Sequence, residues 1–341
     1  MDQIRRPRLS PAMADVRRAV RDALPSRSAG ASGTRVETAP GGLVLVALSG
    51  GPDSLALAAA TAFEAPRAGL RAGAVIVDHG IQPGSAEVAA AAAAQAVELG
   101  LDPVLIRTVT VGETGGPEAA ARTARYAALD EAAAELGAPL ILLGHTLDDQ
   151  AETVLLGLAR GSGGTSLHGM AARSGLYARP LLGIRRETTA RFCLDAGLTP
   201  WIDPQNADES FARVRVRSTV LPTLERELGP GIAEALARTA DQLREDSGAL
   251  DHFAEELAEE LAELAESGIS LPVRALANNP AALRQRLIRL AVESEFHVSL
   301  SRAHTLEVAR LVTHWHGQSA LDLPGVRVER QGNLLLFTSS E

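Results

Sequence analysis

Residues 43–57 of this chain read LVLVALSGGPDSLAL, and this stretch decides the fold. The apolar run 43–48 predicts a buried β-strand, and a helical apolar pattern begins at residue 54. Between them lies a glycine-containing turn. Glycine lets backbone N–H groups come close to a ligand, and a helix N-terminus attracts anions, so this arrangement is typical of phosphate-binding sites. The predicted phosphate-binding residues are Ser49, Gly50, Gly51, Pro52, Asp53 and Ser54.

Strand and helix patterns alternate through the first half of the chain. Strands are predicted at 43–48, 74–78, 104–109 and 140–143, and helices at 54–63, 86–99, 117–136 and 148–159. Nearly continuous apolar strands that alternate with helices predict an α/β fold, in which a parallel sheet is covered on both faces. Ligands bind such sheets beyond the carboxyl ends of the strands. The polar residues just after strands are therefore candidates, and they include Asp78, His79, Gly144 and His145.

The length of 341 residues predicts two domains and a connector. The predicted organisation is an N-terminal extension with one helix and a linker (1–40), the α/β domain (41–225), an acidic helical connector (226–268) and a small α+β domain (269–341). The helix of the connector is expected over 231–266. Helices at 280–294 and 302–315 open the last domain, and three short strand patterns close it.

Composition excludes several classes of protein. The formal charge of −9 argues against binding of nucleic acid through the overall field of the molecule. Six arginines against one acid between Arg160 and Arg191 form a local basic patch, which favours contacts to a phosphate backbone over a merely solvated surface. The single cysteine, Cys193, excludes a disulfide framework and a cysteine-ligated cluster. We find no apolar run of 18 residues and no signal peptide, so we expect a soluble cytoplasmic protein that does not bind a membrane.

A second cluster, GHTLDDQAET at 144–153, runs from a strand end into a helix. Asp148, Asp149 and Glu152 place three carboxylates within five residues, and these repel one another unless they share a cation. The cation is either a metal ion or the ammonium group of a substrate. The alternative is that the acids only suit the positive end of the helix dipole.

A third cluster lies on the helix predicted at 117–136. Arg122 and Arg125 project from neighbouring turns of one face, where their planar guanidinium groups are placed to grip phosphate oxygens. A solvated helix face is the alternative reading. On these residues alone, the phosphate interpretation is favoured.

The motifs together resemble a known family. The turn is not a Walker A loop, which needs a lysine, since this chain contains no lysine at all. Its SGGxDS pattern resembles the pyrophosphate loop (PP-loop) of the N-type ATP pyrophosphatases. With ARxxRY at 121–126 and GHxxDDxxET at 144–153, residues 40–225 resemble the tRNA(Ile)-lysidine synthase family, and 270–341 resemble its C-terminal domain more loosely. One departure is Val214, where many members have asparagine.

The resemblance implies a fold and a reaction. The fold is an adenine-nucleotide α-hydrolase-like catalytic domain over 41–225, with a tRNA-binding domain over 269–341. The C2 oxygen of the wobble cytidine in a CAU anticodon attacks the α-phosphate of ATP, and pyrophosphate leaves. Free L-lysine then displaces AMP to give lysidine, which changes decoding from AUG to AUA. The partners are therefore tRNA(Ile) with a CAU anticodon and lysine, and a homodimer is a candidate assembly.

The resemblance also implies the roles of residues. Backbone N–H groups of 49–54 bind ATP and stabilise the leaving pyrophosphate, and Asp53 holds Mg²⁺. Asp149 and Glu152 bind the lysine ammonium, and His145 shapes the site. Arg122 or Arg125 neutralises charge on the α-phosphate. The expectation is that Asp53→Ala and Glu152→Ala lose lysine incorporation and keep the fold.

Three rival interpretations share the phosphate loop. A thiocytidine or thiouridine synthetase needs several cysteines or an iron–sulfur cluster, which Cys193 alone cannot supply. An amide-forming synthetase, or another tRNA-modifying ATP pyrophosphatase, is the second. A tRNA-binding protein without activity is the third, and it would show no exchange of ATP with pyrophosphate.

Overall fold

The computed structural model describes residues 9–25, 41–80, 82, 84–112, 116–161, 164–261, 263–265 and 268–340. The chain divides into two compact units, residues 1–241 and 242–341, and each has a hydrophobic core of its own. The division lies within helix α9 (Ile232–Leu261), inside the stretch predicted as a connector. Most of the linker predicted in the N-terminal extension lies outside the described residues.

The first unit contains a six-stranded sheet in the order β3-β2-β1-β4-β6-β5. Its parallel strands are β1 (Leu43–Ala47), β2 (Arg71–Asp78), β3 (Val104–Thr108), β4 (Leu140–Leu142) and β6 (Tyr177–Ala178). The edge strand β5 (Arg173–Ser174) pairs antiparallel with β6. The predicted parallel sheet is confirmed, and β1 lies at its centre with β2 and β4 on either side.

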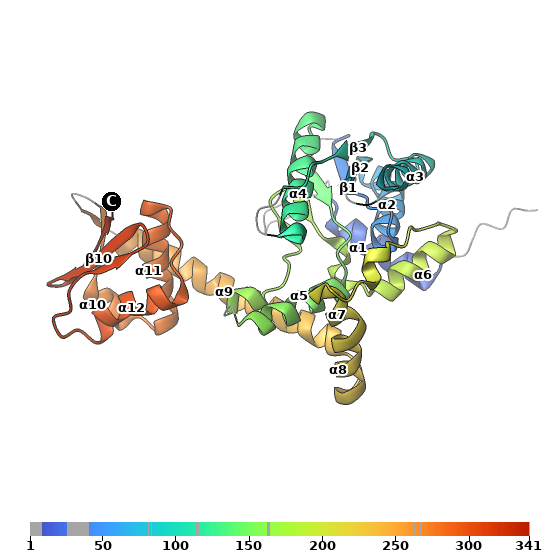
Figure 1. Ribbon diagram of the computed structural model, residues 1–341. Helices are drawn as coiled ribbons and strands as arrows, with labels where there is room; N and C mark the ends of the chain where they lie inside the picture. The colour runs from blue at the N-terminus through green and yellow to red at the C-terminus, as the bar shows by residue number, and fades with distance from the viewer. Residues whose placement is uncertain are drawn as a thin grey trace, which may run out of the picture. The chain divides into compact units, whose positions relative to one another are not determined.

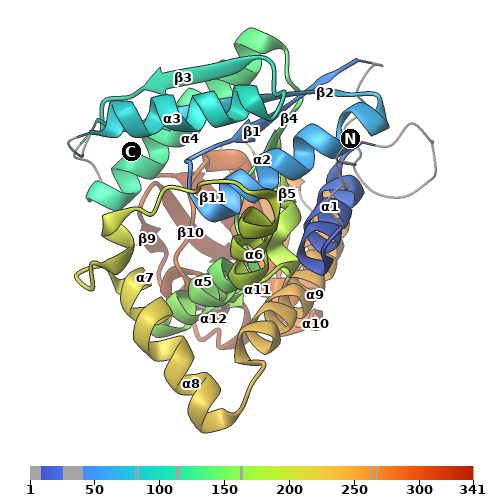
Figure 2. The ribbon, with the colours of Figure 1, turned by 90° about the vertical axis from the view of Figure 1, so that its right-hand side faces the viewer.

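Helices cover both faces of this sheet (Figure 1). One face carries α1 (Pro11–Ala23), α2 (Pro52–Glu64), α3 (Ser85–Glu98) and α6 (Arg186–Ala196), and the other carries α4 (Pro117–Leu136). Side chains of β1 alternate between the two: Val44 and Val46 join the core that contains α2, whereas Leu45 joins the core that contains α4. Figure 2 shows α1, α2 and α6 beside one another, and these three helices contact each other.

The remaining elements of the first unit follow β4. Helix α5 (Leu147–Arg160) begins close to the end of β4, and its residues Leu147 and Ala151 share a small core with α9. The other elements are η1 (Pro66–Ala68), η2 (Gly164–Leu167), η3 (Pro180–Gly183), η4 (Pro204–Ala207), α7 (Ala212–Arg215), the π-helical turn η5 (Val216–Val220) and α8 (Leu221–Leu228). The alternation of patterns faded after Arg160, and the bounds of α6, as well as α7, α8 and the β5–β6 hairpin, were not predicted.

The second unit is an antiparallel sheet in the order β7-β8-β11-β10-β9, packed with helices. Its elements are β7 (Glu263–Ala265), β8 (Gly268–Pro272), α10 (Val273–Asn278), α11 (Ala281–Phe296), α12 (Arg302–Thr313), β9 (Leu321–Leu323), β10 (Val326–Gln331) and β11 (Leu334–Ser339). The prediction of helix as far as residue 266 is wrong at its end. Residues 263–265 pair with β8, and these ladder hydrogen bonds replace those of a continued helix. No helix among the described residues is long and apolar enough to cross a membrane.

Candidate active site

The glycine bend between β1 and α2 is braced by one hydroxyl. Ser54 Oγ accepts a hydrogen bond from the Ser49 backbone N–H (3.2 Å) and donates to the Gly51 carbonyl (3.0 Å). Gly50 has φ +81°, which bends the chain, and Pro52 occupies the first helical turn after Gly51. No acceptor among the described residues pairs with the N–H groups of Gly50, Gly51, Asp53 or Ser54. These donors stand at the positive end of α2, and helix N-termini of this kind attract anions.

The sheet brings the acidic motif against this bend. Gly144 follows β4, which pairs with β1, and a Cβ atom added at Gly144 would lie 3.1 Å from the Ser54 nitrogen. A side chain at this position would crowd the backbone of α2, which would have to shift by a few tenths of an ångström. The two motifs predicted to share the sheet edge are therefore in direct contact, and the close packing explains why glycine occupies position 144.

Helix α5 begins with a capping box. The Thr146 backbone N–H and hydroxyl both donate to Asp149 Oδ2, at 2.8 and 2.9 Å, while Thr146 Oγ1 caps the Asp149 N–H. This leaves Asp149 Oδ1 to face the site. Burial alone would raise the pKa of Asp149, but the Arg186 guanidinium and the hydrogen bonds from Thr146 outweigh it and hold this pKa below its usual value.

Two arginines that the sequence analysis did not single out neutralise the acids. Arg186 Nη2 lies 2.7 Å from Asp149 Oδ1, and its Nη1 lies 3.1 Å from Glu152 Oε1. Arg217 donates to both carboxylate oxygens of Glu152, at 2.8 and 3.2 Å. Glu152 is fully buried, so it requires such partners. The cation that the clustered carboxylates share in this structure is thus guanidinium, and neither the metal ion nor the substrate ammonium expected from the sequence.

The same network reaches the glycine bend. Arg186 Nε lies 3.6 Å from Asp53 Oδ2, and the Thr189 hydroxyl donates to Asp53 Oδ1. Burial raises the pKa of Asp53, although Thr189 and Arg186 oppose that shift. Asp148 lies apart from this group, because it accepts from the Arg186 backbone N–H (2.7 Å) and pairs with Arg185. The doublet Arg185-Arg186 and the alternating arginines at 213–217 are the sequence signals for these partners.

Arg122 and Arg125 lie in a separate group around Tyr126. The Arg122 guanidinium donates to the Tyr126 hydroxyl (3.3 Å), and the Arg125 guanidinium lies 5.7 Å from the centre of the Tyr126 ring. Arg122 is exposed, whereas Arg125 is half-buried. Within the described residues, neither forms an ion pair with a carboxylate of the acidic network.

His145 and His79 lie near these arginines. Burial, followed by the charge of Arg125, lowers the pKa of His145 to about 3, and the same two causes lower that of His79. Both imidazole groups are therefore neutral near pH 7. In each ring Nδ1 is buried without a hydrogen-bond partner among the described residues.

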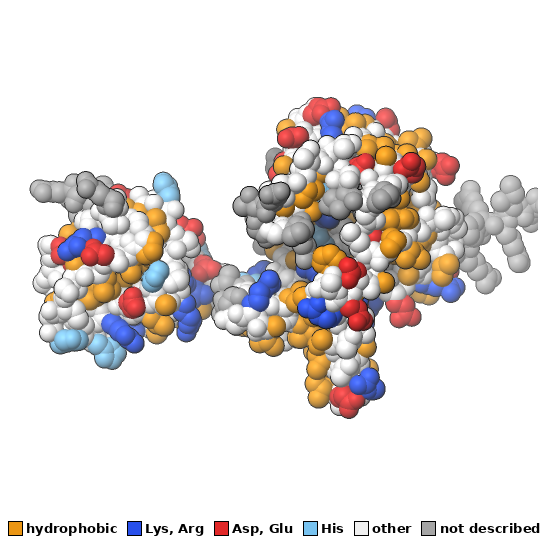
Figure 3. Space-filling model, viewed as in Figure 1, with side chains coloured by type: hydrophobic (Ala, Val, Ile, Leu, Met, Phe, Trp, Pro, Cys, Tyr) orange, Lys and Arg blue, Asp and Glu red, His pale blue; other side chains and the backbone are white. Residues whose placement is uncertain are grey.

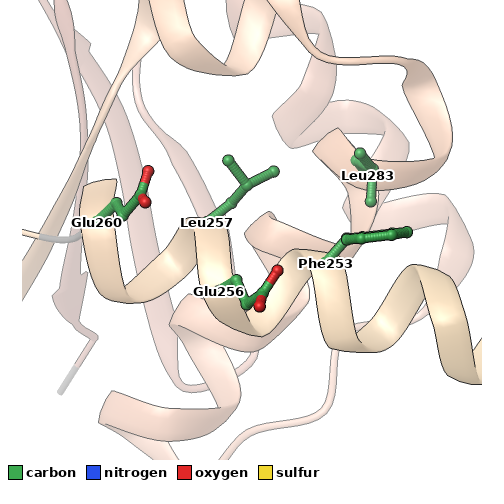
Figure 4. A pocket seen from close by; sticks show the side chains of 5 residues that line it. All are labelled: Phe253, Glu256, Leu257, Glu260 and Leu283. Carbon is green, nitrogen blue, oxygen red and sulfur yellow. The ribbon is translucent and has the colours of Figure 1, made fainter.

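Two cavities lie elsewhere. One, of about 310 Å³, is in the first unit between α5, η3 and α9, and Gln150, Glu234 and Asp241 are among its lining residues. The other, of about 260 Å³, lies between α9 and α11 in the second unit, where Phe253 and Leu283 face each other beside Glu256 and Glu260 (Figure 4). Neither includes a predicted site residue. In the described parts of the chain, no three His, Cys, Asp or Glu side chains are grouped to hold a metal ion.

Comparisons with known proteins match both units. A family model described as a PP-loop domain matches residues 32–224, and one described as a TilS substrate binding domain matches 271–335. A protein of Leifsonia xyli subsp. xyli named tRNA(Ile)-lysidine synthase is 66% identical over 88% of this chain and 90% of its own length. A protein of Thermobifida fusca with the same name is 51% identical over 97% of this chain and 98% of its own.

A solved structure has a fold similar to that of this chain. The U34-tRNA thiolase NcsA from Methanococcus maripaludis, determined with its [4Fe-4S] cluster, is 20% identical to this chain with a TM-score of 0.55. The match covers 69% of this chain and 80% of the thiolase. At this identity the likeness concerns architecture alone.

Proposed function

This chain belongs to the tRNA(Ile)-lysidine synthase family, and we propose from that premise the reaction that it catalyses. The C2 oxygen of the wobble cytidine of tRNA(Ile) with a CAU anticodon attacks the α-phosphate of ATP, and pyrophosphate leaves. The amine of lysine then displaces AMP from C2, which gives lysidine and changes decoding from AUG to AUA. A thiolation reaction is disfavoured because the chain has one cysteine, which cannot ligate an iron–sulfur cluster by itself.

The observation that carries the proposal is the glycine bend. Its unpaired N–H groups at the start of α2 are donors aimed where a pyrophosphate would sit, and the chain has no lysine to act as a Walker A cation. Preorganised backbone donors stabilise a developing negative charge without reorganisation. Residues 49–54 would therefore bind the β- and γ-phosphates and stabilise the leaving group.

Mg²⁺ fits this site through a single carboxylate. Mg²⁺ in nucleotide sites commonly takes one or two carboxylates together with substrate phosphates, so it does not need a cage of protein ligands. Asp53 stands in the first turn of α2 beside the bend, with Oδ2 at 3.6 Å from the nearest guanidinium nitrogen. Bound there, the ion would neutralise charge on the phosphates.

Asp149 and Glu152 would receive the lysine ammonium. Both carboxylates are occupied by Arg186 and Arg217, so an incoming ammonium would replace one guanidinium group in an exchange that keeps the local charge balanced. A buried carboxylate left without a cation costs several kcal/mol, roughly 3–5, which is a reason for the arginines to be there before lysine binds.

The arginines around Tyr126 would bind ATP at its α-phosphate. Arg122 or Arg125 would neutralise the α-phosphate, because neither has a carboxylate partner in the described chain. His145, neutral and next to Gly144, would shape the pocket without adding charge. The second unit would bind the body of the tRNA. A homodimer is compatible with this scheme and is not required by it.

A labelling experiment tests the reaction. The protein is incubated with labelled lysine, ATP and unmodified tRNA, and we expect label in tRNA(Ile) with a CAU anticodon. Changing the wobble C to U should abolish labelling. Label in another tRNA, or none although ATP–pyrophosphate exchange occurs, would point to another member of the ATP pyrophosphatase superfamily.

The roles of Asp53 and Glu152 are tested by variants in which an amide of nearly the same shape replaces the carboxylate. Asp53→Asn and Glu152→Gln should each lower lysine incorporation about 10–100-fold, because each loses a charge-assisted contact of about 1.5–3 kcal/mol. Glutamine is preferable to alanine at 152, because removal of a fully buried, paired carboxylate would also destabilise the fold. The matched control is Glu187→Gln, an exposed acid on α6. Near-normal turnover in both site variants would refute the assignments.

A further inference from the structure

Three guanidinium groups converge on one tyrosine. The Tyr126 hydroxyl lies 3.3 Å from Arg122 Nη2 and 3.5 Å from Arg179 Nη2, and the Tyr126 ring lies below both Arg122 and Arg125. Arg179 follows β6, so it comes from the sheet, while the other two come from α4. The ring of Tyr177 packs edge-on against Tyr126 at 4.8 Å and fixes its orientation.

These three arginines differ in how far their side chains are buried. Arg122 is exposed and Arg125 is half-buried, whereas Arg179 is only 8% exposed. Arg179 is held by two hydrogen bonds, from Nη1 to the Ala171 carbonyl (2.9 Å) and from Nη2 to the Tyr126 hydroxyl. Its Nε–H is buried and has no partner among the described residues, and the same is true of Arg125 Nε.

No negative charge in the described chain balances this cluster. None of the three arginines forms an ion pair there, and the nearby carboxylate of Asp130 accepts from the Tyr177 hydroxyl. Buried charges in proteins are normally paired, and an unpaired buried donor costs about 1–3 kcal/mol. Three like charges with two orphaned donors therefore fit a site whose anion comes from outside the chain. His145 and His79, both with an unpartnered Nδ1, add neutral polar groups beside it.

We propose that Arg179, oriented by Tyr126, is the innermost member of a phosphate-binding site that it forms with Arg125, and that its Nε–H donates to a phosphoryl oxygen of a substrate. This rests on the proposed function, because that reaction brings two phosphate sources here. One is the α-phosphate of ATP, and the other is a phosphodiester of the tRNA beside the wobble cytidine. The site is distinct from the glycine bend, whose donors are backbone N–H groups. The acidic-rimmed cavity of the second unit (Figure 4) has the wrong charge for such a ligand.

The experiment uses the full chain and two binding measurements. The Kd for α,β-methylene-ATP is measured without tRNA, and the Kd for a tRNA(Ile) transcript is measured without nucleotide. The variants are Arg179→Gln, Arg179→Lys, which keeps the charge but loses the planar fork, and Tyr126→Phe, which keeps all three charges and the ring. The matched control is Arg107→Gln, since the Arg107 guanidinium on β3 has Glu135 as its partner.

We expect Arg179→Gln to weaken one Kd about tenfold or more and to leave the other within the range of the control. Arg179→Lys and Tyr126→Phe should weaken the same Kd by smaller factors, with melting temperatures close to that of the unaltered chain. A loss in the nucleotide measurement assigns the α-phosphate, and a loss in the tRNA measurement assigns a phosphodiester.

Three results would overturn the proposal. These are values equal to those of Arg107→Gln in both measurements, an Arg179→Lys variant that binds like the unaltered chain, or a loss in both measurements that accompanies a lowered melting temperature. The labelling experiment with the unaltered chain distinguishes a failure of the Arg179 proposal from a failure of the proposed function. If lysine is incorporated normally and Arg179 is dispensable, only the present inference fails.

Discussion

Gly50 and Gly51 are neighbours that have different reasons to be glycine. Gly50 has φ +81°, a conformation that strains other residues, and an added Cβ would lie 3.4 Å from Ala92 Cβ. Gly51 has φ −72°, and its added Cβ would make an ordinary contact of 3.6 Å with Ser49 Oγ. The backbone conformation therefore requires glycine at position 50. At position 51 the absence of a side chain leaves room for a ligand to approach the backbone.

This difference predicts two separable effects. Gly50→Ala should lower the free energy of unfolding by about 1–2 kcal/mol, the cost of a left-handed conformation for an L-residue. Gly51→Ala should leave it nearly unchanged. Urea unfolding followed by Trp201 fluorescence in a Trp315→Phe background measures this in the first unit. Equal stabilities of the two variants would contradict the assignment of strain to Gly50.

His145 predicts a pH dependence of stability. In the folded chain its pKa is lowered to about 3, whereas an unfolded chain takes up a proton near 6.5. Between these values the unfolded state binds more protons, so stability falls as the pH falls from about 6.5 toward 3. His145→Gln removes this contribution, and its unfolding free energy should decline less steeply from pH 7 to pH 5. Parallel declines would show that His145 is not held neutral.

At the scale of the element, the N-terminus of α5 holds Asp149 in place. Thr146 is fully buried, and its hydroxyl both caps the helix and bonds to the Asp149 carboxylate. Thr146→Ala should therefore cost about 1 kcal/mol of stability, typical of a lost N-cap, and should raise the KM for lysine. Thr146→Ser should restore both.

A second cap provides the control for this prediction. Ser301 caps α12 in the other unit through the His304 N–H at 3.1 Å. Ser301→Ala removes a comparable hydrogen bond from a helix that does not contribute to the proposed lysine site. It should lower the stability of the second unit and leave the KM for lysine unchanged. A similar rise in KM for both variants would mean that Thr146 acts through stability alone.

At the scale of the whole molecule, the two units have separate cores. Among the described residues, the last buried apolar residue of the first unit is Ala240, and the first of the second unit is Ala254. Acidic and basic side chains are interspersed on the face of the first unit shown in Figure 3, in keeping with a net charge of −9. We therefore expect the attraction of tRNA to depend on local groups of arginines and, as proposed above, on the second unit.

A truncated chain tests this division. A fragment that ends at residue 241 should bind α,β-methylene-ATP with a Kd within about threefold of the full chain, because a domain with its own core folds independently. Its affinity for the tRNA(Ile) transcript should fall about tenfold or more, since it would lose the phosphate contacts that we propose for the second unit. Unchanged tRNA binding would place recognition wholly in the first unit.

The elements that the sequence predicted well are those with strong local signals. Strands and helices between residues 43 and 160 agree with the structure to within a few residues, because apolar periodicity and glycine turns are local. The bounds of helix α6 were not predicted, although Glu187 stands in its first turn and Gly197 ends it with φ +68°. The hairpin strands β5 and β6 and the helix α7 have too few residues for a period to emerge.

The sequence by itself determined the order of strand, glycine bend and helix, and it placed the acidic motif at the same sheet edge, because both follow from backbone preferences and burial within short segments. Only the tertiary structure decided which cations meet the acids. Arg186 and Arg217 lie 34 and 65 residues from Glu152 along the chain, yet within 3.1 Å of it in space. The burial of Arg179 was likewise decided by the tertiary structure. Electrostatic partners are chosen by distance in the folded chain, and local sequence patterns contain no information about that distance.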